Sequence, residues 1–162
     1  MTTSEYNKCV DLCADGVFRF IRKNVLNDED AQDVVQNAFE VLWKNREAIN
    51  PEKAKSYLFT AAYHNMIDFF RKHKRTNYVD ELDETAKGST SELQVGVKEA
   101  IEEALAKLPE IQKNVILLRD YEGYSYVEIG EILELTEAQV KVYIFRARQT
   151  LKKYLVSIYH LI

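Results

Sequence analysis

The side chains best suited to bind a charged partner lie near the C-terminal end, where Gln139, Lys141, Tyr143 and Arg146 follow one another closely. Residues 137–154 hold five cations and a single acid, although the whole chain carries a net charge of −4. Cations and amides bind phosphates and the edges of nucleic-acid bases. The stretch therefore predicts recognition of nucleic acid.

Two helix start signals position these side chains. Ser125 with Glu128, and Thr136 with Gln139, have the spacing of a capping box, in which each side chain accepts from the other residue's backbone N–H. The first helix is then about two turns long, and about three residues remain for the turn. This pattern is typical of a helix-turn-helix, whose second helix enters the major groove of DNA.

The second helix of this pair has one apolar face. Val140, Ile144, Ala147 and Leu151 follow the i, i+4, i+7, i+11 spacing of a stripe that faces a core. Val142 lies on the opposite face, where it can touch a thymine methyl group. An ordinary amphipathic helix with a solvated face is the alternative, because short helical hairpins are common.

Charge is unevenly distributed along the chain. Residues 77–96 hold five acids and one lysine, and the other residues are together neutral. Residues 71–75 contain four cations and no acid, and form a second basic cluster. Since contacts with phosphates depend on the local field more than on net charge, the acidic total does not exclude binding to nucleic acid.

Composition and periodicity predict an all-α protein. The 162 residues are 46% apolar and include five glycines and two prolines, without alternating runs of β-branched residues. Apolar periodicity predicts helices over 5–26, 28–46, 51–74, 94–108, 109–123, 125–133 and from 136 onward. Residues 76–93 lose this periodicity and are predicted to be a flexible acidic linker between two helical domains.

Other functional classes lack support in the sequence. No Gly-rich phosphate loop, cluster of metal ligands or nucleophile–base motif is present, so we expect no enzyme, cofactor or metal. Cys9 and Cys13 share a helix face without further ligands; reduced thiols in a core are expected, with redox sensing as the alternative. No apolar run reaches membrane length and the N-terminus does not resemble a signal peptide, so a cytoplasmic protein without membrane insertion is expected.

A resemblance to region 4 of the sigma-70 family, in its extracytoplasmic-function (ECF) branch, is carried by LPEIQKNVILLRDYEGYSYVEIGEILELTEAQVKVYIFRAR. Region 2 of the same family resembles DEDAQDVVQNAFEVLWKN and AKSYLFTAAYHNMIDFFRKHKR. The match covers about 8–75 and 94–155, in the family's order. It implies a three-helix region 2 over 5–75, an acidic connector over 76–93 and a four-helix region 4 over 94–158.

The resemblance implies a sigma factor, which catalyses no reaction but lends core RNA polymerase the recognition of two promoter elements. The −35 element would be read as duplex DNA by Thr136, Gln139, Lys141, Val142, Tyr143 and Arg146. The −10 element would be bound by Tyr57, Tyr63, His64, Asn65, Arg71, Lys72, Lys74 and Arg75. In this second set, exposed aromatic rings would stack on unpaired bases and cations would hold phosphates.

The helix over 28–46 is the one that the family uses to bind the polymerase clamp. The implied contacts are Asp33, Gln36, Asn37 and Phe39. Trp43 is expected in the core instead, because large aromatic side chains usually fill interiors. The other implied partners are promoter DNA and an anti-sigma factor, which is membrane-bound in many members of the family.

Two other functions remain open. A stand-alone helix-turn-helix regulator would bind DNA without polymerase, commonly as a dimer on two half-sites. A module that binds polymerase or an anti-sigma factor would keep the fold without reading DNA, and Val142 and Tyr143 stand where the family often has polar or basic residues. Glu134 occupies a turn position where the family usually has glycine, and costs on the order of 1 kcal/mol if that turn needs a positive φ.

Overall fold

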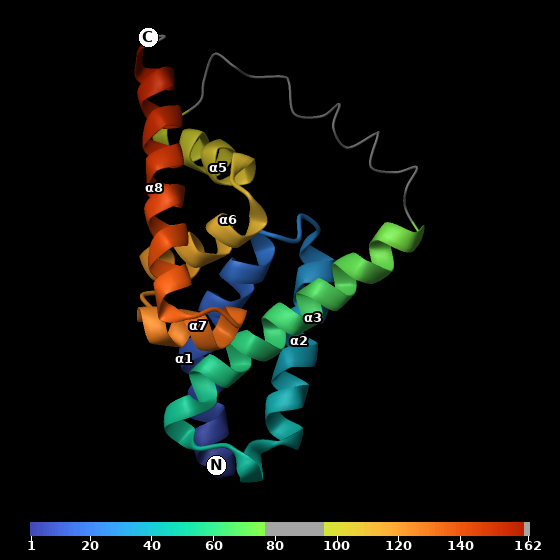
Figure 1. The fold of residues 1–162 in the computed structure, drawn as a ribbon. Coiled ribbons are helices and arrows are strands. Elements are labelled where there is room, and N and C mark those ends of the chain that lie inside the picture. The colour runs from blue at the N-terminus through green and yellow to red at the C-terminus, as the bar shows by residue number, and fades with distance from the viewer. Residues whose placement is uncertain (77–95, 161–162) are drawn as a thin grey trace. The chain divides into compact units, whose positions relative to one another are not determined.

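The computed structural model describes residues 1–76 and 96–160, and every regular element in these ranges is a helix. The predicted all-α class is confirmed (Figure 1). The chain divides into two compact units, Met1–Thr76 with Gly130–Leu135, and Asn77–Ile129 with Thr136–Ile162, and each is described by itself. The predicted acidic linker lies, apart from Thr76, outside the described residues.

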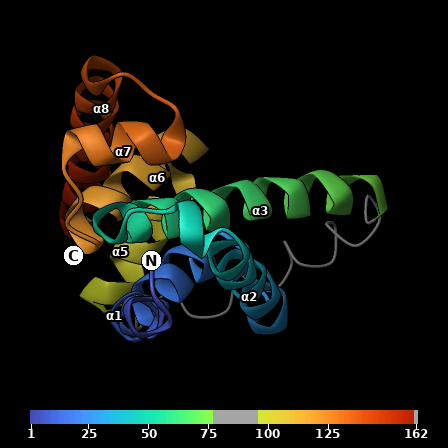
Figure 2. The ribbon, with the colours of Figure 1, turned by 90° about the horizontal axis from the view of Figure 1, so that it is seen from below.

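Three helices form the body of the first unit: α1 (Thr3–Arg22), α2 (Asp28–Lys44) and α3 (Ala54–Thr76). Each packs on the other two, and the rings of Phe20 and Phe59 meet in the core with centroids 5.9 Å apart. Two short 3₁₀ turns, η1 (Arg46–Ala48) and η2 (Pro51–Lys53), connect α2 to α3. The last turns of α3 extend beyond α1 and α2 in both views (Figures 1 and 2), so its basic end lies on the surface.

Polar caps set the helix starts in this unit. Asn27 accepts from the backbone N–H of Asp30, and Asn50 caps η2 with Pro51 at the first helical position. The first helix begins earlier than predicted, because Thr2 and Glu5 form a capping box whose two hydrogen bonds measure 3.0 and 3.1 Å.

The second group of helices comprises α5 (Val97–Lys107), α6 (Glu110–Ile116), α7 (Tyr126–Leu133) and α8 (Glu137–His160). The predicted helix over 109–123 consists of two helical segments: α6 ends at Ile116 and is followed directly by η4, a π-helical turn over Leu117–Tyr121. Within the second unit, α8 packs on α5 and α6, and Val140, Ile144 and Ala147 are buried as the sequence predicts.

Two of these helical segments end at a residue with positive φ. Gly123 has φ 75° and Glu134 has φ 59°. Tyr124, which follows Gly123, donates six residues back to the carbonyl of Leu118 at 3.0 Å, whereas Leu135, which follows Glu134, donates five residues back to that of Gly130 at 2.9 Å. The bond from Leu135 to Gly130 is that of the Schellman arrangement, in which a glycine at the positive-φ position avoids the steric penalty that a Cβ incurs. The condition stated for Glu134, a turn that needs a positive φ, is therefore met.

Replacing Glu134 with glycine should therefore stabilise the chain by about 1 kcal/mol, because the backbone keeps its conformation and loses the clash of the Cβ. The measurement is the midpoint of urea unfolding followed by circular dichroism. Glu134→Ala is the matched control, since it removes the same carboxylate and retains the Cβ. Equal midpoints for the glycine and alanine variants would show that the strain assigned to this residue is absent.

The two cysteines lie in α1 as free thiols. Cys13 is only 4% exposed and Cys9 is half-buried, so the expected core packing is confirmed for Cys13 and holds in part for Cys9. The hydrogen bond from Cys9, opposed by burial and aided by the charge of Lys55, lowers the pKa of Cys13 to about 7. The same shared proton, together with burial, raises the pKa of Cys9.

Candidate nucleic-acid interfaces

Both predicted capping boxes of the helix-turn-helix are formed. Ser125 Oγ accepts from the N–H of Glu128 at 3.2 Å, and the Glu128 carboxylate accepts from the N–H of Ser125 at 3.1 Å. Thr136 and Gln139 make the same pair of bonds at 3.1 and 2.9 Å. These bonds satisfy backbone donors that the helix cannot satisfy itself, so the start of α8 is fixed by its own side chains.

The outward face of α8 carries the predicted −35 residues. Thr136, Gln139, Lys141, Val142 and Arg146 are exposed, and Tyr143 is half-buried. Val142 is 45% exposed and Phe145, one turn further on, is 61% exposed. Phe145 was not among the predicted residues, although its i+3 spacing from Val142 places both on one stripe. The face combines apolar contact surface with cations and an amide, as base readout requires.

The polar residues of this face differ in how far they are already engaged. Gln139 uses its carbonyl oxygen in the capping box, so its amide N–H groups remain to donate. Lys141 lies 3.6 Å from Glu137 and 5.8 Å from the ring centroid of Tyr126. Arg146 makes no hydrogen bond or ion pair with any of the residues that the structure describes. Of these three, Arg146 is the side chain most available to a ligand.

Arg148 has a different role from Arg146. Its guanidinium donates to the carboxylate of Asp120 over 2.8 Å, and this hydrogen bond raises the pKa of the arginine. The bond joins α8 to the π-helical turn η4 within the second unit. Arg148 therefore links α8 to η4, and we do not count it among the cations of the outward face of α8.

A cation–aromatic cluster beside the helix-turn-helix was missed by the sequence analysis. The guanidinium of Arg119 lies 4.6 Å from the ring centroid of Tyr126 and donates to the backbone carbonyl of Tyr124 at 2.8 Å. Tyr126 thus has Arg119 and Lys141 near one ring. Because Arg119 and Lys141 are 22 positions apart in sequence, no local pattern indicates that they share an aromatic neighbour.

The predicted −10 residues of α3 are only partly exposed. His64 is exposed, whereas Tyr57 and Tyr63 are half-buried. The ring centroids of Tyr63 and His64 lie 6.0 Å apart. The side-chain nitrogen of Asn65 is buried and has no hydrogen-bond acceptor within the described ranges. The rings of Tyr63 and His64 are therefore more accessible to a ligand than the side-chain nitrogen of Asn65.

The basic end of α3 is exposed. Arg71 lies 3.7 Å from Asp68, and Lys72 and Lys74 are solvent-accessible. Arg75 belongs to the same helix, but its side chain lies outside the described part of the structure. The grouping of cations at one helix end suits phosphate binding, and it also suits the negative end of the helix dipole.

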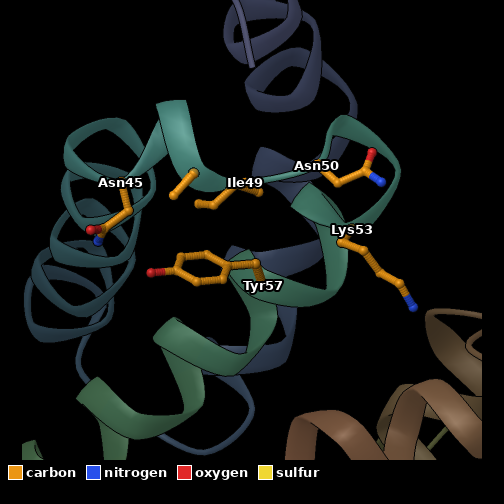
Figure 3. A pocket seen from close by; sticks show the side chains of 6 residues that line it. Asn45, Ile49, Asn50, Lys53 and Tyr57 are labelled. Carbon is orange, nitrogen blue, oxygen red and sulfur yellow. The ribbon is translucent and has the colours of Figure 1, made fainter.

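The first unit contains an open pocket of about 400 Å³ where α2 passes through the two 3₁₀ turns into α3. Its lining residues are Asn45, Ala48, Ile49, Asn50, Lys53 and Tyr57. Figure 3 shows the ring of Tyr57 below Ile49 with its hydroxyl turned toward Asn45, whereas Lys53 extends its ammonium away from the ring. The volume lies within the range of small-ligand sites.

Two of the lining residues keep polar groups that make no bond within the described residues. Asn45 donates its amide to the carbonyl of Val41 at 2.9 Å, which leaves its side-chain oxygen as an acceptor. Asn50 accepts from the N–H of Glu52 at 3.1 Å, which leaves its amide as a donor. The sequence predicted Tyr57 as a site residue but not Asn45, Asn50 or Lys53, which no local motif marks as ligand-binding.

The predicted polymerase-binding residues share the exposed side of α2. Asp33, Gln36 and Asn37 are exposed and Phe39 is half-buried. Trp43 is not in the core, contrary to expectation: it is 37% exposed and lies between Tyr6, at 4.8 Å between ring centroids, and Arg46, at 3.7 Å. The stripe of α2 that faces α1 and α3 passes through Ala38 and Leu42, so Trp43 lies at its edge.

No group of three or more metal-binding side chains occurs in the described ranges. Likewise, none of the described helices is both long and apolar enough to cross a membrane.

Comparison of the sequence with known families gives two matches. Residues 9–76 match Sigma-70 region 2, and residues 98–151 match Sigma-70, region 4. RNA polymerase sigma factor SigV of Bacillus subtilis (strain 168) is 31% identical over 137 residues, which cover 83% of this chain and 81% of the relative. ECF RNA polymerase sigma factor SigM of the same strain is 29% identical over 141 residues, covering 84% and 86%.

Solved structures show the same fold. The sigma factor RpoE from Bartonella quintana, in complex with the anti-sigma factor NepR, aligns with a TM-score of 0.76 at 19% identity, over 94% of this chain and 98% of that one. CnrH, in complex with the cytosolic domain of CnrY, aligns with a TM-score of 0.68 at 22% identity, over 94% and 88%.

Proposed function

The chain belongs to the sigma-70 family, in its ECF branch, and from this premise we propose how its surfaces divide the work of a promoter-recognising RNA polymerase sigma factor. Region 2 binds core polymerase and the −10 element, and region 4 reads the −35 element. The observation that carries the −35 assignment is the exposed face of α8, with Arg146 unpaired among the described residues behind a helix start fixed by Thr136 and Gln139.

We propose that α8 enters the major groove with its N-terminal half. The backbone N–H groups beside Thr136 then lie at the positive end of the helix dipole, where a phosphate is favoured. Gln139 and Arg146 donate to base edges, and Val142 with Tyr143 supplies apolar contact. Lys141 is partly neutralised by Glu137, so its contact is the weaker one and suits a phosphate at the edge of the groove.

For the −10 element we propose that an unpaired base enters the pocket beside Tyr57. The ring offers a stacking surface, and the free oxygen of Asn45 accepts from a base edge. Lys53 and the cations Arg71, Lys72, Lys74 and Arg75 hold the phosphates of the strand. Tyr63 and His64 offer a second stacking surface, whereas the side-chain nitrogen of Asn65 is buried.

For core polymerase we propose the exposed side of α2, with Asp33, Gln36 and Asn37 at its centre and Phe39 at its edge. Trp43 adds a half-exposed aromatic surface that Tyr6 and Arg46 hold in one orientation. Aromatic anchors of this kind commonly dominate protein interfaces. Since polymerase acts in the cytoplasm, we place the chain there, and we assign it no catalytic reaction of its own.

We propose an anti-sigma factor as a further partner, because the aligned structure of RpoE is a complex with the anti-sigma factor NepR. Each DNA-binding surface is small, so each is expected to bind weakly by itself. Joining the two regions on polymerase raises the effective concentration of the second contact once the first is made. This arrangement explains how a chain with a net charge of −4 binds DNA.

Reconstitution tests this function. Core bacterial RNA polymerase supplemented with the chain should initiate at a defined set of start sites in a library of genomic fragments, and mapping those sites gives both promoter elements. The chain with Asp33→Ala and Gln36→Ala is expected to bind core polymerase about fivefold to tenfold more weakly, on the order of 1 kcal/mol, with unchanged circular dichroism.

Two outcomes would reject parts of this account. Protection of a promoter by the chain without polymerase would favour the stand-alone regulator. Binding to polymerase without any promoter-specific initiation would favour the interaction module. The matched control for the α2 surface is Glu29→Ala, which removes an exposed carboxylate from the first turn of the same helix and should leave polymerase binding unchanged.

A further inference from the structure

Two sulfur atoms lie close together on α1, and neither belongs to the surfaces assigned above. The Sγ atoms of Cys9 and Cys13 are 4.0 Å apart, with the thiol of Cys9 donating to the sulfur of Cys13. Both are free thiols. Cys9 is half-buried and reaches solvent, whereas Cys13 is held against the core by the helix. The pair is therefore ordered and open on one side.

A direct disulfide does not fit this pair. Residues four apart in a helix have Cβ atoms about 5–6 Å apart. A disulfide needs a Cβ–Cβ distance of about 3.5–4.5 Å and a sulfur–sulfur bond of about 2.05 Å. Oxidation of the pair would therefore require α1 to unwind at Cys13, which belongs to the core of the first unit.

A single bridging atom fits without such movement. With metal–thiolate bonds of about 2.3 Å, two sulfurs 4.0 Å apart subtend an angle of about 120° at the metal. This is the angle of three-coordinate geometry, and the open side at Cys9 leaves room for a third ligand from solution. Thiolates select soft ions, among which Cu(I) accepts a low coordination number.

We propose that Cys9 and Cys13 form a two-sulfur binding site for a soft monovalent metal ion of the Cu(I) class. Binding replaces the proton that the two sulfurs share and releases the thiol protons to solvent, and no electron is transferred. Lys55, on α3, carries a positive charge that favours the thiolate form of this pair. Zn²⁺ is a poorer fit, because structural zinc sites use four protein ligands and no described group supplies three.

The test uses the full, reduced chain under anaerobic conditions with Cu(I) as the probe and the coloured chelator bicinchoninate as competitor. The chain should withdraw one Cu(I) from the chelator. Cys9→Ser and Cys13→Ser should each bind on the order of 100-fold more weakly, because a single thiol loses the advantage of chelation. The melting temperature should rise with Cu(I) for the parent chain and remain unchanged for both variants.

Cys9→Ser is the primary variant, since Cys9 is half-buried and its replacement leaves the core intact; circular dichroism verifies the fold of both variants. Equal Cu(I) affinity for the parent and Cys9→Ser would overturn the proposal, as would a stoichiometry of two ions, one per thiol. Displacement of Cu(I) by equimolar Zn²⁺ would also overturn it. None of these readouts depends on DNA or polymerase.

Discussion

Replacing Arg146 with alanine is expected to weaken −35-dependent initiation by roughly 5- to 150-fold, which corresponds to about 1–3 kcal/mol for a contact with a base. The reason is that Arg146 is exposed and makes no ion pair within the described residues, so its donors are available to DNA. The measurement is initiation by reconstituted polymerase, at one fixed salt concentration, on a promoter and on single-base variants of its −35 element. Discrimination should relax at one or two positions.

Two further substitutions separate readout of bases from attraction to phosphates. Arg146→Lys keeps the charge and loses the planar fork that binds guanine at two atoms, so it should recover overall binding and not discrimination. Lys153→Ala removes an exposed cation two turns further along α8 and should change binding only slightly. Lys141→Ala should cost less than Arg146→Ala, because Glu137 already partly neutralises Lys141. Unaltered initiation by the Arg146→Ala chain would refute the assignment of this residue.

Replacing Tyr57 with alanine is expected to reduce binding of single-stranded −10 DNA by about 1–3 kcal/mol, the usual effect of removing an aromatic ring that stacks on a base. The ring forms one wall of the 400 Å³ pocket, with Ile49 and Asn45 beside it (Figure 3). The measurement is the affinity of reconstituted polymerase for a forked DNA whose −10 element is unpaired. Tyr57→Phe is the matched control, since it keeps the stacking surface and removes only the hydroxyl.

The DNA used in this experiment decides its interpretation. On fully paired DNA that carries only the −35 element, Tyr57→Ala should bind as the parent chain does, whereas Arg146→Ala should be impaired. On a DNA that carries the −35 element and an unpaired −10 element, the double variant should show the sum of the two losses in binding free energy, because the effects of independent sites are additive. An equal loss by Tyr57→Ala on both DNAs would indicate that the substitution disturbs the first unit and not a base pocket.

Local patterns predicted most of the fold. The boxes at Ser125 and Thr136 depend on residues within a few positions of one another, so the sequence contains them completely. The capping box at Thr2 and Glu5 has the same local spacing, but it was not predicted. The prediction that Trp43 lies in the core was wrong, because apolar periodicity identifies the buried stripe of α2 but not where that stripe ends. Trp43 lies at the edge of the stripe, where its ring is only partly covered.

The candidate sites were predicted less completely, because their parts come from distant positions. The pocket joins the end of α2, two 3₁₀ turns and the start of α3, and only Tyr57 carried a recognisable signal. Arg146 and Arg148 look alike in sequence, yet one is unpaired within the described chain and the other bonds to Asp120, 28 residues away. Which cation serves DNA and which serves the fold is decided by such long-range pairs.

The bond between Arg148 and Asp120 bears on the speed of promoter search. It joins α8 to η4, and Val140, Ile144 and Ala147 bury the same helix on its inner side, so the proposed reading surface is already formed in the chain without DNA. If α8 reads the −35 element as proposed, we expect no disorder-to-order step between collision and capture. We then expect mismatched sites to be released quickly, so that many sequences are sampled within the lifetime of one polymerase complex.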